Sequence, residues 1–124
     1  MAKATPDAVL DVMLDEIATA TTLYVCSDQP ANFAGIAAVA LADVALTPGD
    51  GNGDFVIADG DVSGRKLTVG AQADFEVLVT GEADHIVLAD ASLLLYVTTC
   101  APQTITDGNT VSTSAWDIEI ADPA

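Results

Sequence analysis

Basic residues are the scarcest chemical feature of this 124-residue chain. It has 3 lysines and arginines against 19 aspartates and glutamates, which gives a formal net charge of −16 at pH 7. Nucleic-acid binding needs a basic stripe with stacking aromatic residues, and anionic membranes repel a surface this negative. We therefore expect neither nucleic acid nor membrane as a partner. Disorder is also disfavoured, because 51% of the residues are hydrophobic.

Other residue types are equally informative by their scarcity. Aromatic residues make up 5% of the chain, so the core must consist mainly of Val, Ile, Leu and Ala. No run reaches the roughly 18 apolar residues of a membrane span. Asp7 and Asp11 interrupt the apolar runs that a signal peptide would need. The length predicts one domain, made and folded in a cytoplasm.

The chain has two cysteines, Cys26 and Cys100, and neither belongs to a CxxC motif. With a single histidine in the chain, they do not form a metal-binding set. The favoured interpretation is two small buried thiols, and a disulfide between them is the alternative.

Residues 1–20 are predicted to form a helix, with Thr5 as the capping residue and Pro6 at the first helical position. Apolar residues at helical spacing form one stripe: Leu10, Met13, Leu14 and Ile17. Acids spaced four apart lie on the opposite side: Asp7, Asp11 and Asp15. Like charges at this spacing weaken an isolated helix. We expect an N-terminal arm over 1–20 that contacts a neighbouring subunit, and a β domain over 21–124 that folds without it.

From residue 21 the apolar pattern changes from a helical period to the alternation of strands. Predicted strands cover residues 21–26, 36–46, 55–58, 66–69, 75–80, 85–89, 93–99 and 116–120. Turn residues separate them at short intervals, with no helical crossovers. The predicted fold is mainly β, an antiparallel β-sandwich or barrel-like domain of short strands with one N-terminal α-helix.

Catalytic chemistry has little support in the sequence. No nucleophile elbow and no HExxH motif is present. His85 begins an apolar strand and is expected to satisfy a local hydrogen bond rather than act as a general base. We predict no catalytic residue, no bound cofactor and no enzyme activity.

A weak calcium candidate lies in the Gly-rich segment after residue 48. Oxygen ligands alternate there, and the candidate set is Asp50, Asn52, Asp54 and Asp61. Phe55 stands where a calcium loop needs glycine, and no helix flanks the segment. A polar hairpin tip is the favoured interpretation.

Arg65 and Lys66 are the only basic residues beyond the start of the chain. The simpler interpretation is that they neutralise Asp59 and Asp61. The alternative is that they anchor the protein on an acidic patch of a partner subunit. Together with Leu10, Met13, Leu14 and Ile17, they form the candidate partner-binding set.

Several segments resemble small virion structural proteins of tailed bacteriophages, of the capsid decoration (cement) or auxiliary type. They are residues 59–69, 83–90, 94–99, 108–111 and 115–123. They describe hairpins and a terminal strand rather than a chemical site. The resemblance implies a protein on the capsid exterior of a virion, made in the host cytoplasm.

On this resemblance we expect a non-enzymatic protein that bridges subunits of the major capsid protein and stabilises the capsid. It is expected to be a homotrimer. Three alternatives stay open: a tail or head-completion component, an acidic DNA-mimic inhibitor, and a calcium-dependent binding module.

Overall fold

The computed structural model describes residues 6–121 and begins with helix α1 (Asp7–Ile17). Pro6 occupies the N-cap position, so the helix starts one residue later than the sequence predicted, and Thr5, the predicted cap, lies outside the described residues. The carbonyl of Pro6 accepts hydrogen bonds from the backbone N–H groups of Val9 and Leu10. The proline thus starts the helix without a side-chain cap, because its fixed φ suits that position.

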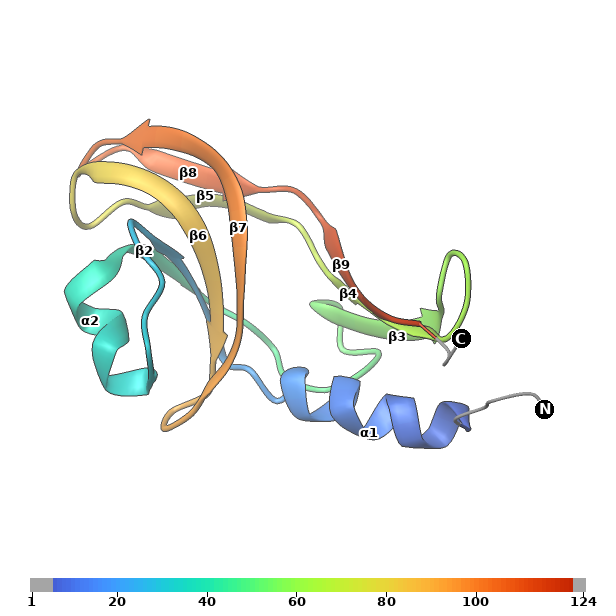
Figure 1. Ribbon diagram of the computed structural model, residues 1–124. Coiled ribbons are helices and arrows are strands. Elements are labelled where there is room, and N and C mark those ends of the chain that lie inside the picture. The colour runs from blue at the N-terminus through green and yellow to red at the C-terminus, as the bar shows by residue number, and fades with distance from the viewer. Residues whose placement is uncertain (1–5, 122–124) are drawn as a thin grey trace.

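Within residues 6–121, nine strands form three antiparallel sheets (Figure 1). The largest contains β1 (Thr22–Cys26), β2 (Ala40–Ala45), β6 (Gly81–Ala89) and β7 (Leu94–Ile105), in the order β2-β1-β6-β7. The second contains β3 (Phe55–Asp59), β4 (Arg65–Val69) and β9 (Trp116–Ile120), in the order β3-β4-β9. The third pairs β5 (Gln72–Glu76) with β8 (Thr110–Thr113). The predicted fold class, mainly β and antiparallel with an N-terminal helix, is confirmed.

The segment 36–46 was predicted as mostly strand, and this prediction is wrong in its first half. A 3₁₀ turn, η1 (Phe33–Gly35), leads into a single helical turn, α2 (Ile36–Val39), and β2 begins only at Ala40. The side chain of Asn32 caps this turn by accepting a hydrogen bond from the N–H of Gly35 at 2.9 Å. Ile36 is buried beneath it. The cap and the buried anchor together outweigh the β-preference of the following residues.

Other strands also begin or end at residues that differ from the predicted ones. Strand β5 begins earlier than predicted, β7 runs further, and β8 was not predicted as a strand. Gly81 lies between the predicted strands 75–80 and 85–89, where a turn was expected, but it begins β6, and an added Cβ there would lie 3.0 Å from the Leu41 side chain. A strand glycine can thus mark close approach of a neighbour rather than a turn.

Two hydrophobic clusters lie on the large sheet. The main one gathers the inner residues of all three sheets together with α1, and Leu14, Phe55 and Leu67 are fully buried in it. The smaller one lies around Cys26, Ile36 and Val87, with Phe33 and Val39 packed against it. Residues of the η1–α2 segment thus cover the smaller cluster, while α1 and the other sheets enclose the main one.

The large sheet bends toward β5 and β8 as an incompletely closed barrel (Figure 1). At one edge, the carbonyl of Leu41 in β2 accepts hydrogen bonds from Leu78 and Val79, and Ala42 forms a bridge with Val77. At the other edge, β7 has no strand partner beyond β6 among the described residues. A turn at 106–109 joins β7 to β8, but the two strands do not pair. The barrel is therefore open between β7 and β8.

Candidate functional site

Three apolar side chains on α1 face away from the core. Val9, Val12 and Met13 are 55%, 67% and 58% exposed. Their spacing of three and four residues places them on one side of the helix. We call these three residues the helix outer face. A helix on the surface of a globular domain normally turns polar residues outward, so an apolar outer face is a candidate contact surface.

The opposite side of α1 is fixed in the core. Leu10, Leu14 and Ala18 are buried, and Ile17 packs against the main cluster. Burial of this side holds α1 in place on its own domain. The helix outer face is therefore part of a rigid surface.

An ion pair adds a second attachment. Arg65 on β4 contacts Asp11 on α1 through Nε–Oδ1 at 2.8 Å and Nη2–Oδ2 at 3.4 Å. The Nη1 atom of Arg65 also donates to Asp59 at 2.8 Å. The hydrogen bonds that Arg65 donates to Asp11, and then the one to Asp59, raise the pKa of its guanidinium above the ordinary value. The forked geometry fixes the orientation of α1 against β4.

These positions correct the predicted partner-binding set. Leu10 and Leu14 lie in the protein's own core, and Ile17 is largely covered there, so these three do not form a contact surface. Met13 alone of the predicted stripe is exposed. Val9 and Val12 were missed, although their spacing with Met13 was visible in the sequence. Sequence alone could not tell which of two apolar sides faces the core.

Arg65 and Lys66 both act as internal counter-charges, the simpler of the two interpretations. Lys66 Nζ lies 2.8 Å from Asp61 Oδ1 and 3.6 Å from Asp117 Oδ2. Its hydrogen bond with Asp61 raises the pKa of the ammonium group. Since both cations are already paired, neither is free to anchor an acidic partner. By contrast, Asp7, Asp15 and Glu16 on α1 form no ion pair with any described residue.

The calcium candidates hold the loop at residues 47–57 together through their oxygens. Asp50 Oδ1 accepts a hydrogen bond from the N–H of Ile57 at 2.8 Å, and Asp54 accepts from Thr47 and Gln72. Asn52 donates to the carbonyl of Pro48. Asp61 lies outside this loop, between β3 and β4, and pairs with Lys66. Within residues 6–121, no group of three or more acidic, His or Cys side chains could hold a metal ion. The set does not converge, and the favoured interpretation, a polar loop, agrees with these contacts.

The cysteines are free thiols in different environments. Cys26 is buried, and burial, followed by the charge of Asp84, raises its pKa to about 12. Cys100 is partly exposed, and burial followed by Asp84 also raises its pKa. Neither environment favours a thiolate. His85 Nδ1 contacts Asp84 at 2.6 Å, the local hydrogen bond expected for it.

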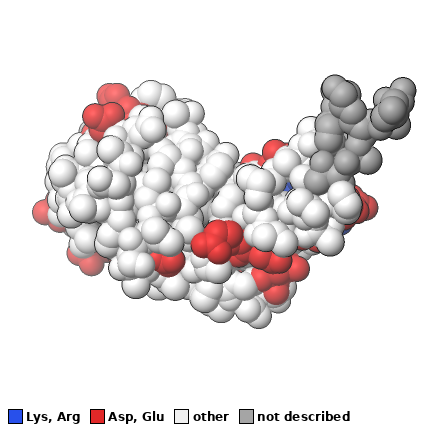
Figure 2. Space-filling model, turned by 60° about the horizontal axis from the view of Figure 1, so that its bottom comes forward, with Lys and Arg blue, Asp and Glu red and all other residues white. Residues whose placement is uncertain are grey.

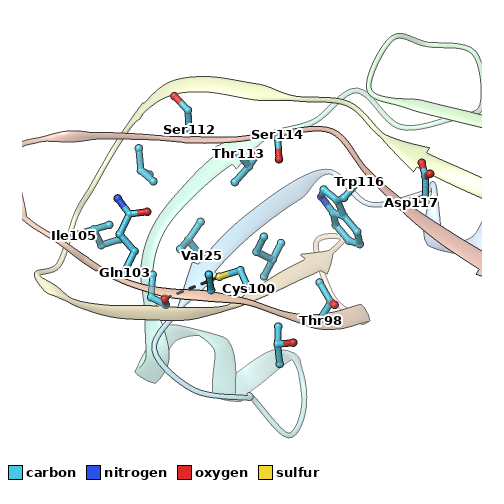
Figure 3. Close-up of a pocket in the computed structure, with 15 residues that line it drawn as sticks. Val25, Thr98, Cys100, Gln103, Ile105, Ser112, Thr113, Ser114, Trp116 and Asp117 are labelled. Atoms are coloured by element: carbon cyan, nitrogen blue, oxygen red, sulfur yellow. Dashed lines mark hydrogen bonds between the residues drawn. The ribbon is translucent and has the colours of Figure 1, made fainter.

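The opening of the barrel forms a groove of about 470 Å³ between β7 on one side and β8 and the start of β9 on the other (Figure 3). Side chains from Gln103 and Ile105 line the β7 side, and Thr113 and Trp116 point inward from the opposite side (Figure 3). Trp116 stacks on Tyr96 of β7, with ring centroids 5.9 Å apart. This aromatic contact bridges the two sides where the strands themselves do not pair.

Two buried polar atoms in this groove lack hydrogen-bond partners among the described residues. They are the Oγ1 atom of Thr113 and the Nε1 atom of Trp116. A buried polar group without a partner costs about 1–3 kcal/mol. The groove and the unpaired edge of β7 together are called the uncharged surface below, because no lining residue except Asp117 is charged.

Comparisons with known protein families, curated proteins and solved structures found no match for this chain. No helix within residues 6–121 is long and apolar enough to cross a membrane. The function must therefore be argued from the chain's own surface.

Proposed function

We propose that this protein is a non-enzymatic structural protein of a tailed-phage virion, which binds the capsid exterior and bridges neighbouring subunits of the major capsid protein. The observation that carries this proposal is the helix outer face: Val9, Val12 and Met13, exposed on a helix whose other side is held in the core. The assignment to a virion rests on the resemblance of the hairpins and the terminal strand to decoration proteins.

Charge supports docking on a coat protein through this face. Asp7, Asp15 and Glu16 are exposed on the same helix and form no ion pair with any described residue. A partner that buries the helix outer face and presents Lys or Arg at its rim would neutralise them. A standard interface covers about 800 Å² per partner, so the helix and the residues around it must both contribute.

A mechanical role follows from this mode of binding. Apolar area buried across the junction of two coat subunits opposes their separation under the pressure of packaged DNA. The acidic remainder of the surface keeps the protein from binding DNA. No bond is made or broken in this proposed function.

Co-sedimentation with empty phage heads that lack a decoration protein tests the proposal. Val12→Ser combined with Met13→Ser should reduce the bound fraction strongly, because it removes apolar contact without touching the core. The matched control is Val62→Ser combined with Val79→Ser, at exposed valines outside α1, and should bind as the wild type does. Wild-type protein that stays in the supernatant would refute the proposal.

A further inference from the structure

The uncharged surface differs in charge from the rest of the molecule. Asp107 is the only charged residue among residues 91–116, in a chain with 19 acidic residues. On the face drawn in Figure 2, acidic side chains gather in separate groups, and much of the lobe that holds the large sheet is white. A long segment without charge is unexpected on a protein of net charge −16, since dispersed charge is what keeps such a protein monomeric.

The same surface has unused hydrogen-bonding capacity. β7 is a 12-residue strand with no neighbour on its outer side among the described residues. Such an edge, about 40 Å long if extended, presents a row of backbone N–H and C=O groups. The Thr113 hydroxyl and the Trp116 indole N–H add two buried groups that need partners. An edge strand and unsatisfied groups in one place are what strand addition by another polypeptide would use.

We propose that a second copy of this chain binds at the uncharged surface. Two molecules of charge −16 repel each other, so a stable contact between copies must form where neither presents acids. The uncharged surface comes closest to this condition, because its one charged lining residue, Asp117, already faces Lys66 at 3.6 Å, whereas the helix outer face is flanked by unpaired acids. An interface of about 800 Å² per copy would take roughly an eighth of the 6652 Å² of accessible surface.

Pro102 limits how the copies can pair. It lies inside β7, next to an irregularity in the pairing register with β6. A proline has no N–H to donate, so a ladder along this edge is interrupted there. The longest uninterrupted stretch of this edge is therefore the part of β7 before Pro102.

This inference gives a location to the self-association that was expected from the family resemblance, and it does not depend on binding to a capsid. Its test therefore uses the isolated full-length protein. If changes to the helix outer face abolish capsid binding, the inference about a second copy still stands. It also stands if the proposed function proves wrong.

The experiment is sedimentation equilibrium, supported by native mass spectrometry, on the wild type and two double variants. Thr99→Glu combined with Gln103→Glu adds two charges to the groove, where both side chains are exposed. Thr47→Glu combined with Gln29→Glu makes the same two exchanges at exposed positions elsewhere. Circular dichroism and thermal unfolding verify that each variant folds.

The wild type should be oligomeric, and the groove variant should dissociate with an apparent Kd raised at least about tenfold. The control variant has the same net charge as the groove variant, but it should match the wild type because its added charges lie outside the groove. A wild type that is monomeric at all accessible concentrations would overturn the proposal. Equal dissociation of the two variants would show that net charge, rather than this surface, sets the association.

Discussion

The helix outer face and the uncharged surface are both unpartnered in this chain, but they differ in what surrounds them. Val9, Val12 and Met13 lie on a helix that also carries exposed, unpaired acids. Most of the uncharged surface comes from residues 91–116, where Asp107 is the only charge, and Asp117 is the one charged residue that lines the groove. In a protein this acidic, the positions without charge are as informative as the charged ones. They suggest different partners: a basic-rimmed surface for the first, a second copy for the second.

The largest expected effect comes from removing α1. Leu14 and Ala18 belong to the same buried cluster as residues of all three sheets. We therefore expect a chain that starts at Thr21 to lose its cooperative thermal transition, the opposite of the expectation from sequence. Differential scanning calorimetry measures this directly. A truncated protein that retains a sharp transition would show that α1 is a separable arm. The helix outer face would then belong to that arm, and the uncharged surface to the β domain.

A smaller effect separates the two sides of α1. Leu14→Ala leaves a cavity in the core and should lower the free energy of unfolding by about 2–5 kcal/mol. The neighbouring Met13→Ala should change it by no more than about 0.5 kcal/mol, because Met13 is exposed. Urea denaturation of both variants gives the comparison. Equal losses would mean that Met13 is also covered in solution, by a second copy or by another part of the chain.

The two thiols compare the core with the uncharged surface, because Cys26 is buried and Cys100 lines the groove. Cys26 has its pKa raised from 9.0 to about 12, so the unfolded thiol ionises before the folded one. Stability from this group is fully present below pH 9 and falls as pH rises from 9 to about 12, by at most about 1.4 kcal/mol per pH unit. Urea midpoints measured between pH 8 and pH 10.5 should show this slope.

Cys26→Ala should flatten the pH slope, while Cys100→Ala should keep most of it, because Cys100 lines the groove and is only partly covered. The slope is the quantity compared, since either substitution can alter the absolute stability. A slope that vanishes with Cys100→Ala instead would mean that the groove is covered in solution.

The smallest expected effect concerns the ion pair that orients α1. Asp11→Asn removes the charge that contacts Arg65 and should lower the urea midpoint slightly. Asp15→Asn is the matched control, because Asp15 is exposed and forms no ion pair with any described residue. The control should leave the midpoint unchanged or raise it by relieving repulsion between like charges. The difference between the variants should shrink in about 1 M salt, where screening acts over about 3 Å. Identical midpoints at low salt would show that burial alone orients the helix.

Much of the architecture could be predicted from local pattern. The alternation in Trp116–Ile120 predicted β9 with its observed bounds, and the helical spacing before residue 18 predicted α1. Boundaries failed where a contact distant in sequence overrode local preference. Gly81 begins β6 with the Leu41 side chain close against it, and the helical turn at Ile36–Val39 is held by a cap and a buried anchor.

The candidate site was less predictable than the fold. Arg65 and Lys66 were recognised, and their acidic neighbours Asp59 and Asp61 are close in sequence. Asp11, which forms the forked contact with Arg65, lies 54 residues away and carries no local signal. Likewise, the stacking of Trp116 on Tyr96 across the groove has no local signal, because it depends on how β7 and β9 are placed in the fold.

The sequence by itself determined the strong acidity, the mainly β class and the amphipathic character of the first helix, because composition and periodicity act through local geometry. Only the tertiary structure decided which side of α1 faces the core and that the barrel stays open between β7 and β8. Both depend on how distant segments pack: one side of the helix meets the sheets, and β7 and β8, although consecutive, diverge too far to pair.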